Sequence, residues 1–362
     1  MPTRHSILDP PRARAALLGW FRIHARPLPW RLTRDPYKIW VSEVMLQQTR
    51  ISTVIPYYRR FIQAFPSCRH LARARFERVA ELWSGLGYYR RARHLHAAAR
   101  QIDRDYGGLF PTSYEEACRL PGVGSYTASA ILSIAYRQPY PAIDGNVARV
   151  IARLAILEGH VQQRAFRAAV EWNAERLISR REPGKFNQAL MELGQIVCTP
   201  SQPACPRCPL KNLCRARLAG IPDRFPMPRP RRACEQQHLA AAVISKRGRF
   251  ALIRGLDNGL LTDMWNFPAA FGKSGRNALA RLKTKLRGLT SSPVEFTPIE
   301  STIRHGITHR QILVQPYLAR VTARRLSPAF RWLSRENLDR AAVSQLALKI
   351  ARAARVSEES DE

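Results

Sequence analysis

Hydrophobic residues recur at helical spacing through the first two-thirds of the chain. Apolar positions three and four residues apart predict amphipathic helices at 39–49, 76–83, 91–106 and 126–136. Short segments with glycine or proline separate these stretches, so we expect distinct helices joined by short loops. Residues 1–216 are therefore predicted to form a mainly helical domain.

The pattern changes beyond residue 216. Residues 217–237 contain four prolines and no periodic apolar face, which predicts an extended linker. Alternation with a period of two then predicts strands, with Lys246-Arg247-Gly248 as a hairpin turn and a further strand at 311–321. With helices expected at 277–286 and 343–355, residues 238–355 are predicted to be an α+β domain, followed by a disordered acidic tail at 356–362.

Composition adds a partner class to this picture. The chain has 362 residues, 45% of them hydrophobic, which is enough for two domains with their own cores. Its 59 Lys and Arg against 27 Asp and Glu give a net charge of +32, which favours a polyanion such as nucleic acid, although a merely basic, arginine-rich protein is the alternative. No apolar run approaches the roughly 18 to 20 residues of a membrane span, and the first residues lack the apolar stretch of a secretory signal. We expect an intracellular, cytoplasmic monomer, associated with the nucleoid if bacterial.

Four of the seven cysteines crowd into one short segment with the spacing C-x6-C-x2-C-x5-C: Cys198, Cys205, Cys208 and Cys214. One loop can wrap four such thiolates around a single centre, and in a reducing compartment this indicates a metal site more than disulfides. Four sulfur ligands suit either zinc or an iron-sulfur cubane. Only one C-x2-C pair occurs, which disfavours zinc knuckles, and free thiols are the third possibility. The neighbouring Arg207 and Lys211 could contact phosphates.

A glycine-containing turn precedes one of the predicted helices. Gly122 and Gly124 stand just before a helix whose first turn carries Ser125 and Thr127. Glycines permit a tight turn, and the free amides of a helix start attract an anion. The segment at about 118–136 therefore predicts a phosphate-binding helical hairpin, with an ordinary helix turn as the alternative.

Two carboxylates stand in otherwise apolar segments. Glu43 lies in PYKIWVSEVMLQQT and Asp144 in AIDGNVA. Glu43 shares a predicted helix face with Ile39 and Gln47, and partial burial there would raise its pKa towards that of a useful acid. The structural alternatives are a solvated helix residue for Glu43 and a helix cap for Asp144.

In this order, the segments from about residue 28 to 214 resemble the MutY-type adenine DNA glycosylases, which are helix-hairpin-helix proteins related to endonuclease III. The resemblance implies a 4Fe-4S cluster on the four cysteines. It also implies hydrolysis of the N-glycosidic bond of adenine mispaired with 8-oxoguanine or guanine in double-stranded DNA, as a step of base-excision repair. In that family Glu43 would protonate adenine N7, Asp144 would stabilise or briefly bond the sugar cation, and Tyr126 and Asn146 would assist Asp144 by hydrogen bonds.

Tyr126 separates this chain from the endonuclease III branch. That branch carries a lysine at the same hairpin position as its Schiff-base nucleophile, whereas tyrosine offers no amine. The substitution favours base removal without efficient strand cleavage, with buried packing as an alternative role for Tyr126. Two other functions stay open: an endonuclease III-like glycosylase-lyase, and a non-enzymatic iron-sulfur protein that binds DNA.

Removal of a stacked base also requires its extrusion from the duplex. The resemblance implies that Gln48 and Thr49 face the orphaned oxidised guanine and that Tyr88 is an intercalating wedge, although a tyrosine at such a helix junction could simply pack. The residues expected to contact DNA or the lesion are Arg31, Gln48, Thr49, Leu86, Tyr88, Gly122, Gly124, Ser125, Thr308 and His309.

The second domain resembles the Nudix-like C-terminal domain of the same family through Met264-Trp-Asn-Phe-Pro268 and the segment 304–310. Residues 264–294 contain no Asp or Glu, so Mg²⁺-dependent hydrolysis of the Nudix kind is not expected. The family probes the lesion with a Phe-Ser-His loop, which aligns with Ile307-Thr308-His309. The hydroxyl and the imidazole are kept while the aromatic ring is lost, and a simple strand-edge position is the alternative for His309.

Overall fold

The computed structural model describes residues 6–228 and 235–359, except for 263, 291, 308–309, 323–325, 339–340 and 342. The chain divides into two compact units, one formed by 1–74 with 93–230 and the other by 75–92 with 231–362. Within the described residues, no helix combines the length and the apolar character needed to cross a bilayer. Each unit is described by itself below.

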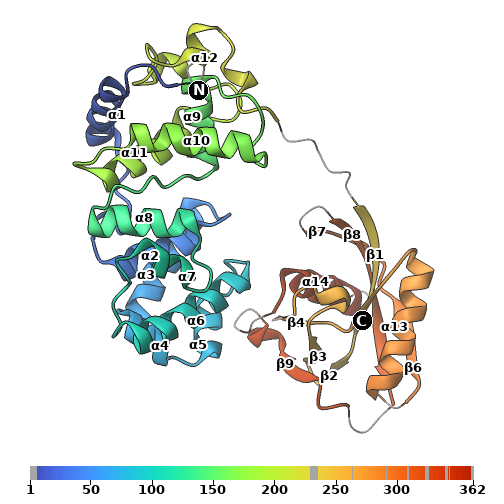
Figure 1. Cartoon of the computed structure of the whole chain (residues 1–362). Coiled ribbons are helices and arrows are strands. Elements are labelled where there is room, and N and C mark those ends of the chain that lie inside the picture. Colours follow the sequence, from blue (N-terminus) through green and yellow to red (C-terminus); the bar gives the residue numbers. More distant parts are fainter. Residues whose placement is uncertain are drawn as a thin grey trace. The chain divides into compact units, whose positions relative to one another are not determined.

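The first unit is helical, as predicted (Figure 1). Its helices and short 3-10 turns are α1 (Pro10–His24), η1 (Pro29–Arg31), α2 (Pro36–Leu46), α3 (Ile51–Ala64), α4 (Cys68–Arg73), α6 (Tyr89–Asp105), α7 (Tyr114–Arg119), α8 (Ser125–Tyr136), α9 (Gly145–Ala155), α10 (Arg164–Leu177), α11 (Pro183–Ile196), η2 (Cys205–Arg207), α12 (Arg215–Leu218) and η3 (Pro222–Arg224). The helix α5 (Phe76–Leu82) and the first residues of α6 group with the second unit, where Ala80 and Tyr89 pack with Met264.

The ends of α2 show why its boundaries differ from the predicted 39–49. A carboxylate oxygen of Asp35 accepts a hydrogen bond from the N–H of Tyr37 at 2.9 Å, and Pro36 needs no N–H in the first turn. The helix therefore begins ahead of its first buried aliphatic residue. It ends at Leu46, and two residues later Gln48 has a φ of 58°, which no α-helix contains.

The helix α8 packs against α2 on one side and α11 on the other, and α11 also packs against α9 and α1. A Cβ atom at Gly194 of α11 would lie 2.7 Å from the Cβ of Asn146, so only glycine permits this approach to α9. Leu17, Ile151 and Leu193 are fully buried between these helices. Burial of one such side chain contributes about 1.5–3 kcal/mol, so the packing fixes the relative positions of α8, α9 and α11.

The first part of the segment 217–237, expected to be an extended linker, packs into the helical unit instead, and residues 229–234 lie outside the described part of the chain. The helix α12 continues to Leu218, and Ile221 and Phe225 pack into the core of the helical unit. The carbonyl oxygen of Phe225 accepts a 2.9 Å hydrogen bond from Nε of Arg153. Apolar residues isolated between prolines have no periodicity, so the sequence pattern concealed these anchors. The first strand of the second unit already starts at Glu235.

The second unit is α+β (Figure 1). Its elements are β1 (Glu235–Val243), β2 (Ser245–Lys246), β3 (Arg249–Arg254), η4 (Asp257–Gly259), β4 (Trp265–Asn266), β5 (Ala269–Gly272), α13 (Gly275–Thr290), β6 (Val294–Pro298), β7 (Ile303–Ile307), β8 (Arg310–Val321), β9 (Arg331–Ser334), η5 (Arg335–Asn337) and α14 (Gln345–Glu359). One sheet has the order β5-β1-β8-β6, with β7 also paired to β8, and a second has the order β2-β3-β4, with β9 paired to β3.

Strand β1 pairs in parallel with β8, from Glu235 opposite Arg310 to Val243 opposite Leu318. Its side chains alternate between two cores. Leu239, Ala241 and Val243 pack in the core that contains residues of α14, whereas Ala240, Ala242 and the following Ile244 pack with residues of α13. Burial on both faces explains why this strand reads as a continuous apolar run.

Strand and helix predictions in the second domain are confirmed, with one correction. The turn at 246–248 joins the paired strands β2 and β3, and both Arg247 and Gly248 have positive φ, as such hairpin turns require. The helix α14, however, extends to Glu359, so residues 356–359 are helical rather than a disordered tail. Residues 360–362 lie outside the described part of the chain.

Candidate active site

A pocket of about 1100 Å³ in the helical unit collects residues that are far apart in the sequence. Glu43 comes from α2, Tyr126 from the first turn of α8, and Asp144 and Asn146 from the start of α9. Arg31, Gln48 and Thr49, which the sequence analysis assigned to DNA contacts, line the same pocket. The contacts of α8 with α2 and α11 bring these side chains together.

Glu43 is 7% exposed, and the hydroxyl of Tyr126 donates a 2.8 Å hydrogen bond to its Oε2 atom. Burial raises the pKa of Glu43 to about 7, because burial outweighs the opposing effects of the Tyr126 hydrogen bond and the Arg31 charge; the Asp144 charge adds to the rise. At neutral pH this carboxyl group is therefore divided between its acid and base forms. The solvated-residue alternative for Glu43 does not agree with this burial.

Asp144 combines a cap with a position in the pocket. Its Oδ1 atom accepts a 2.7 Å hydrogen bond from the N–H of Val147, and its Oδ2 atom accepts one of 2.8 Å from Nδ2 of Asn146. It is thus the N-cap of α9, where the exposed amides of the helix start favour a negative charge. Asp144 thus accepts two hydrogen bonds at a helix start, whereas Glu43 is buried.

Hydrogen bonds continue from Asn146 to the cysteine segment. Oδ1 of Asn146 accepts a 2.8 Å bond from Nη2 of Arg149, and Nε of Arg149 donates to the carbonyl oxygen of Cys198 at 2.9 Å. Nη2 of Arg149 also donates to the carbonyl oxygen of Gly194 at 2.8 Å. The first turns of α9 therefore connect the pocket to the segment with the clustered cysteines.

The side chains of Cys198, Cys205, Cys208 and Cys214 line one small cavity. Arg153 is 2% exposed and donates to the sulfur of Cys198 at 3.3 Å, to the carbonyl oxygen of Thr199 at 2.7 Å and to that of Pro200 at 2.9 Å. Burial raises the pKa of the Cys208 thiol to about 12. In the ranges that the structure describes, no set of three or more His, Cys, Asp or Glu side chains is placed to hold a metal ion. By type alone, four cysteine sulfurs lining one cavity are the donor set of a group that is held by several thiolates.

The glycine-containing hairpin lies between α7 and α8. Gly122 has a φ of 75°, and a Cβ atom there would lie 2.7 Å from the Cβ of His94, so this position requires glycine on both counts. Gly124 is the N-cap of α8, and Ser125 is exposed at the first position of the helix. Ser125 also lines a second cavity together with Tyr126 and Asp144, so the free amides of the hairpin lie beside the pocket.

The remaining predicted DNA contacts differ in their exposure. Tyr88 is 57% exposed with a φ of 51°, and the guanidinium of Arg91 lies 5.2 Å from its ring centroid. Leu86 is 5% exposed, so of these two only Tyr88 presents its side chain to solvent. Thr308 and His309 lie outside the described residues, and their expected lesion contact stays a prediction.

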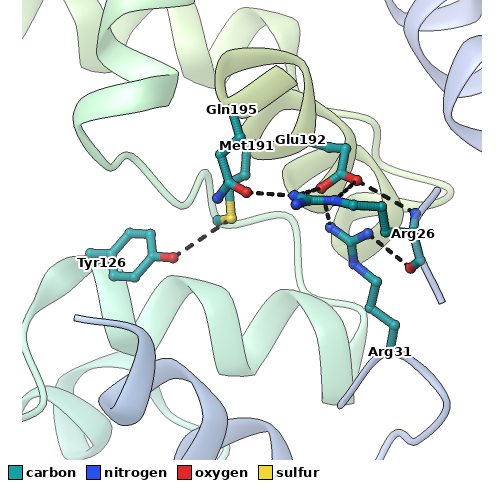
Figure 2. Close-up of polar contacts among 6 residues, drawn as sticks. All are labelled: Arg26, Arg31, Tyr126, Met191, Glu192 and Gln195. Atoms are coloured by element: carbon teal, nitrogen blue, oxygen red, sulfur yellow. Dashed lines mark hydrogen bonds and ion pairs between the residues drawn. The ribbon is translucent and has the colours of Figure 1, made fainter. Parts of the chain in front are cut away.

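The sequence analysis missed one wall of the pocket. Gln188, Met191 and Gln195 of α11 line it, together with Arg26. The hydroxyl of Tyr126 lies 3.6 Å from the sulfur of Met191, and Arg26 donates to Gln195 at 2.6 Å. Both contacts are drawn in Figure 2. Polar residues at helical spacing within the apolar segment FNQALMELGQI were the available signal.

Comparisons with known proteins agree with this architecture. A family described as HhH-GPD superfamily base excision DNA repair protein matches residues 41–175, and the NUDIX domain family matches 239–353. A thermostable thymine-DNA glycosylase has a TM-score of 0.52 and 28% identity over 58% of this chain and 97% of its own. An endonuclease III trapped as a covalent intermediate with DNA, at 23% identity and a TM-score of 0.50, shares the fold over 59% of this chain and 99% of its own.

Curated relatives match nearly the whole chain. The adenine DNA glycosylase of Rattus norvegicus is 36% identical over 96% of this chain and 78% of its own length. That of Homo sapiens is 33% identical over 94% of this chain and 73% of its own. That of Buchnera aphidicola subsp. Acyrthosiphon pisum is 32% identical over 84% and 85%, respectively. The chain is therefore a DNA glycosylase and belongs to the adenine DNA glycosylase family.

Proposed function

We propose that this chain removes adenine paired with 8-oxoguanine or guanine from double-stranded DNA by hydrolysing the N-glycosidic bond. Glu43 is the acid, and Asp144 is the counter-ion of the sugar cation. One observation carries the proposal: two carboxyl groups with opposite environments line a single pocket. Glu43 is buried and has a pKa of about 7, whereas Asp144 accepts two hydrogen bonds at the start of a helix. Opposite environments of this kind separate an acid from a stabilising anion.

The chemistry follows from these two environments. Protonated Glu43 gives its proton to N7 of the extruded adenine, which weakens the bond between N9 and the sugar C1′. The bond then breaks with its electron pair on the base, and positive charge develops on the sugar. The Asp144 carboxylate, fixed by Asn146 and the N–H of Val147, stabilises that charge. Water then adds to C1′ and gives one proton to the Glu43 carboxylate, which leaves adenine, an abasic site and the restored acid.

The pocket supports base removal without strand cleavage. A lyase forms a Schiff base between a primary amine and the sugar C1′. The cationic side chains that line this pocket in the described part of the chain are Arg26, Arg31 and Arg50, none of which is a primary amine. The first turn of α8 carries Tyr126, whose hydroxyl donates a hydrogen bond to Glu43. We therefore expect no covalent capture by borohydride.

Recognition of the opposite base is proposed for two parts of the chain. Gln48 and Thr49 line the pocket next to α2, and Gln48 holds a left-handed backbone conformation that breaks the helix there. Tyr88 is exposed, so its ring is free to insert between bases, and the guanidinium of Arg91 lies against that ring. We assign the second contribution to the Nudix-like domain, 238–355, through Thr308 and His309, in agreement with the family resemblance.

The four cysteines that line one cavity are proposed to hold a 4Fe-4S cluster. When bound, the cluster would supply a cross-link that fixes the segment 198–214, and it would take no part in the bond cleavage. Lys211 also lines this cavity, and Arg207 lies in η2, so the folded segment presents cations to phosphates. Purified protein should show the visible charge-transfer absorbance of iron-sulfur clusters, and Cys205→Ser should lose it.

The decisive assay is single-turnover base release. Duplexes containing 8-oxoguanine:adenine, guanine:adenine or thymine glycol are compared, with abasic sites revealed by alkali. We expect release from the two adenine duplexes and none from thymine glycol. Asp144→Asn should abolish release while sparing DNA binding, and Glu158→Gln, an exposed change outside the pocket, should leave the rate unchanged. Efficient release from thymine glycol with covalent capture by borohydride would contradict the proposal.

A further inference from the structure

A buried carboxylate that the chemistry above does not use lies beside the pocket. The side chain of Glu192 in α11 has no exposed surface, yet it is held by two guanidinium groups (Figure 2). Nε and Nη2 of Arg26 donate to its two oxygens at 2.5 and 2.6 Å, and Nη2 of Arg31 donates to Oε2 at 2.8 Å. Paired groups of this kind are strong only when every partner is in place, so the cluster specifies one arrangement.

Arg31 is held from three directions. Besides its bond to Glu192, its Nη1 atom donates to the carbonyl oxygen of Arg26 at 3.2 Å, and its guanidinium carbon lies 5.2 Å from the ring centroid of Phe21. Its side chain is 13% exposed and lines the pocket that contains Glu43. Burial opposes ionisation of Glu192, but the hydrogen bonds from Arg26 and Arg31 outweigh it and lower its pKa to about 2. Glu192 is thus a permanent anion at working pH.

The charge of this cluster bears on Glu43 through Arg31, the member of the cluster that acts on that carboxyl group. Two guanidinium groups and one carboxylate leave one positive charge at the pocket wall. The groups that act on Glu43 are Tyr126 from α8, Asp144 from the start of α9 and Arg31 from η1, and the charge of Arg31 lowers the pKa of Glu43. Two further cations, Arg26 and Arg50, line the same pocket.

We propose that Glu192 is a positioning residue of the glycosylase reaction: it fixes Arg31 at the pocket wall and offsets one of the two positive charges of Arg26 and Arg31. The inference deepens the proposed function, on which it rests. Without this anion, Glu43 would hold its proton less tightly, and a smaller fraction of the protein would carry the proton that adenine receives. The carboxylate therefore acts on the reaction through Arg31 without touching the substrate.

Glu192→Gln keeps the size of the side chain and removes its charge. The two charges of Arg26 and Arg31 are then no longer offset, so the pH above which excision declines should move down. If the pKa of Glu43 falls by about one unit, the protonated fraction at pH 8 falls about tenfold, whereas the rate at pH 5.5 stays within about threefold of wild type. Glu192→Asp, which keeps the charge, should restore the wild-type position of the decline.

Arg26→Gln supplies the opposite test and uses a side chain that is 35% exposed, so folding is less at risk. It leaves a net charge of zero in the cluster, and the decline in rate should move to higher pH. The matched control is Glu182→Gln at the N-cap of the same helix, where the carboxylate pairs with Arg22 and Lys185 outside the pocket. This control should leave the pH profile in place.

The measurement is the single-turnover rate on an 8-oxoguanine:adenine duplex between pH 5 and 9 for the wild type and these variants. A uniform loss of rate in Glu192→Gln with an unchanged pH profile would overturn the inference, as would a downward or absent shift in Arg26→Gln. Titration of the Glu43 carboxyl by ¹³C NMR, identified by its absence in Glu43→Gln, gives the same shifts without substrate. If the wild type releases no adenine, the proposed function fails, while the NMR titration still decides whether Glu192 controls Glu43.

Discussion

Replacement of Glu43 by Gln tests both the acid and its environment. Glu43 is 7% exposed, and its burial, partly offset by the hydrogen bond from Tyr126, raises its pKa from 4.5 to about 7. One pKa unit corresponds to about 1.36 kcal/mol, so the folded state favours the protonated form by about 3 kcal/mol over the unfolded chain. The same burial that provides a useful acid should therefore destabilise the fold when Glu43 ionises.

The sign of this effect depends on pH. Below pH 4.5 the carboxyl group is protonated in both states, and no cost arises. Between pH 4.5 and 7 the unfolded chain releases the proton while the folded protein retains it, so stability falls as pH rises. Gln has no proton to release. The variant should be more stable than the wild type by about 1 kcal/mol at pH 5.5 and by about 3 kcal/mol at pH 8.

Thermal unfolding followed by far-UV circular dichroism at the two pH values measures this difference. A growth in the difference of about 2 kcal/mol corresponds to a relative Tm increase of roughly 4–8 °C for a unit of this size. In the same preparation excision should be abolished while DNA binding is largely spared. The exposed Glu158→Gln change is the control and should show no pH-dependent gain. An equal stability difference at both pH values, or excision by Glu43→Gln at near wild-type rate, would refute the reasoning.

Three further outcomes follow from the same contacts. The single-turnover rate of the wild type should be level below about pH 6 and fall towards tenfold per pH unit above pH 8, because Glu43 must hold a proton and its pKa is about 7; a rate that rises over this range contradicts the acid. Gly194→Ala places a Cβ 2.7 Å from that of Asn146, so it should lower the free energy of unfolding by about 1–3 kcal/mol and reduce excision at least tenfold. The control Gly19→Ala, with open space around it, should reduce neither. Arg153→Met leaves several buried acceptors near Cys198 without a donor, so it should lower the free energy of unfolding by more than about 3 kcal/mol and reduce the cluster absorbance. Retention of both would contradict the role of Arg153 in holding the cysteine segment.

Periodicity predicted the helices and strands well because burial of one face requires apolar residues at a regular spacing along the sequence. The helix 126–136 and the strand 311–321 agree with α8 and β8 to within one residue. Boundaries set by other forces were misplaced. The start of α2 depends on the cap by Asp35, and the packing of the first part of the predicted linker depends on Ile221 and Phe225, two isolated apolar anchors in a proline-rich segment. Neither a cap nor an isolated anchor produces a repeating pattern.

The candidate site divides in the same way. Glu43 and Asp144 stood out as charged residues in apolar segments, but that pattern left a solvated residue and a helix cap as alternatives, and only the family resemblance implied their roles. The hairpin glycines stood out because glycine permits a tight turn. The opposing wall could not be identified, since the partners of Glu192 lie more than 160 positions away, at Arg26 and Arg31. From the sequence alone, a glutamate within a helix is expected to face solvent; only the three-dimensional structure shows the cations that pair with it.

That long-range pairing also gives a physical reason for the buried charges. An isolated carboxylate in the position of Glu192 would be too costly to keep ionised, and two guanidinium groups without it would repel one another at the pocket wall. An apolar replacement of the whole cluster could be at least as stable, so stability alone does not account for it. What an apolar cluster could not provide is the charge of Arg31, fixed within reach of Glu43 and partly offset by a neighbouring anion. The balance of charge across α11 and η1 is therefore explained by the protonation of the acid rather than by the packing of the fold.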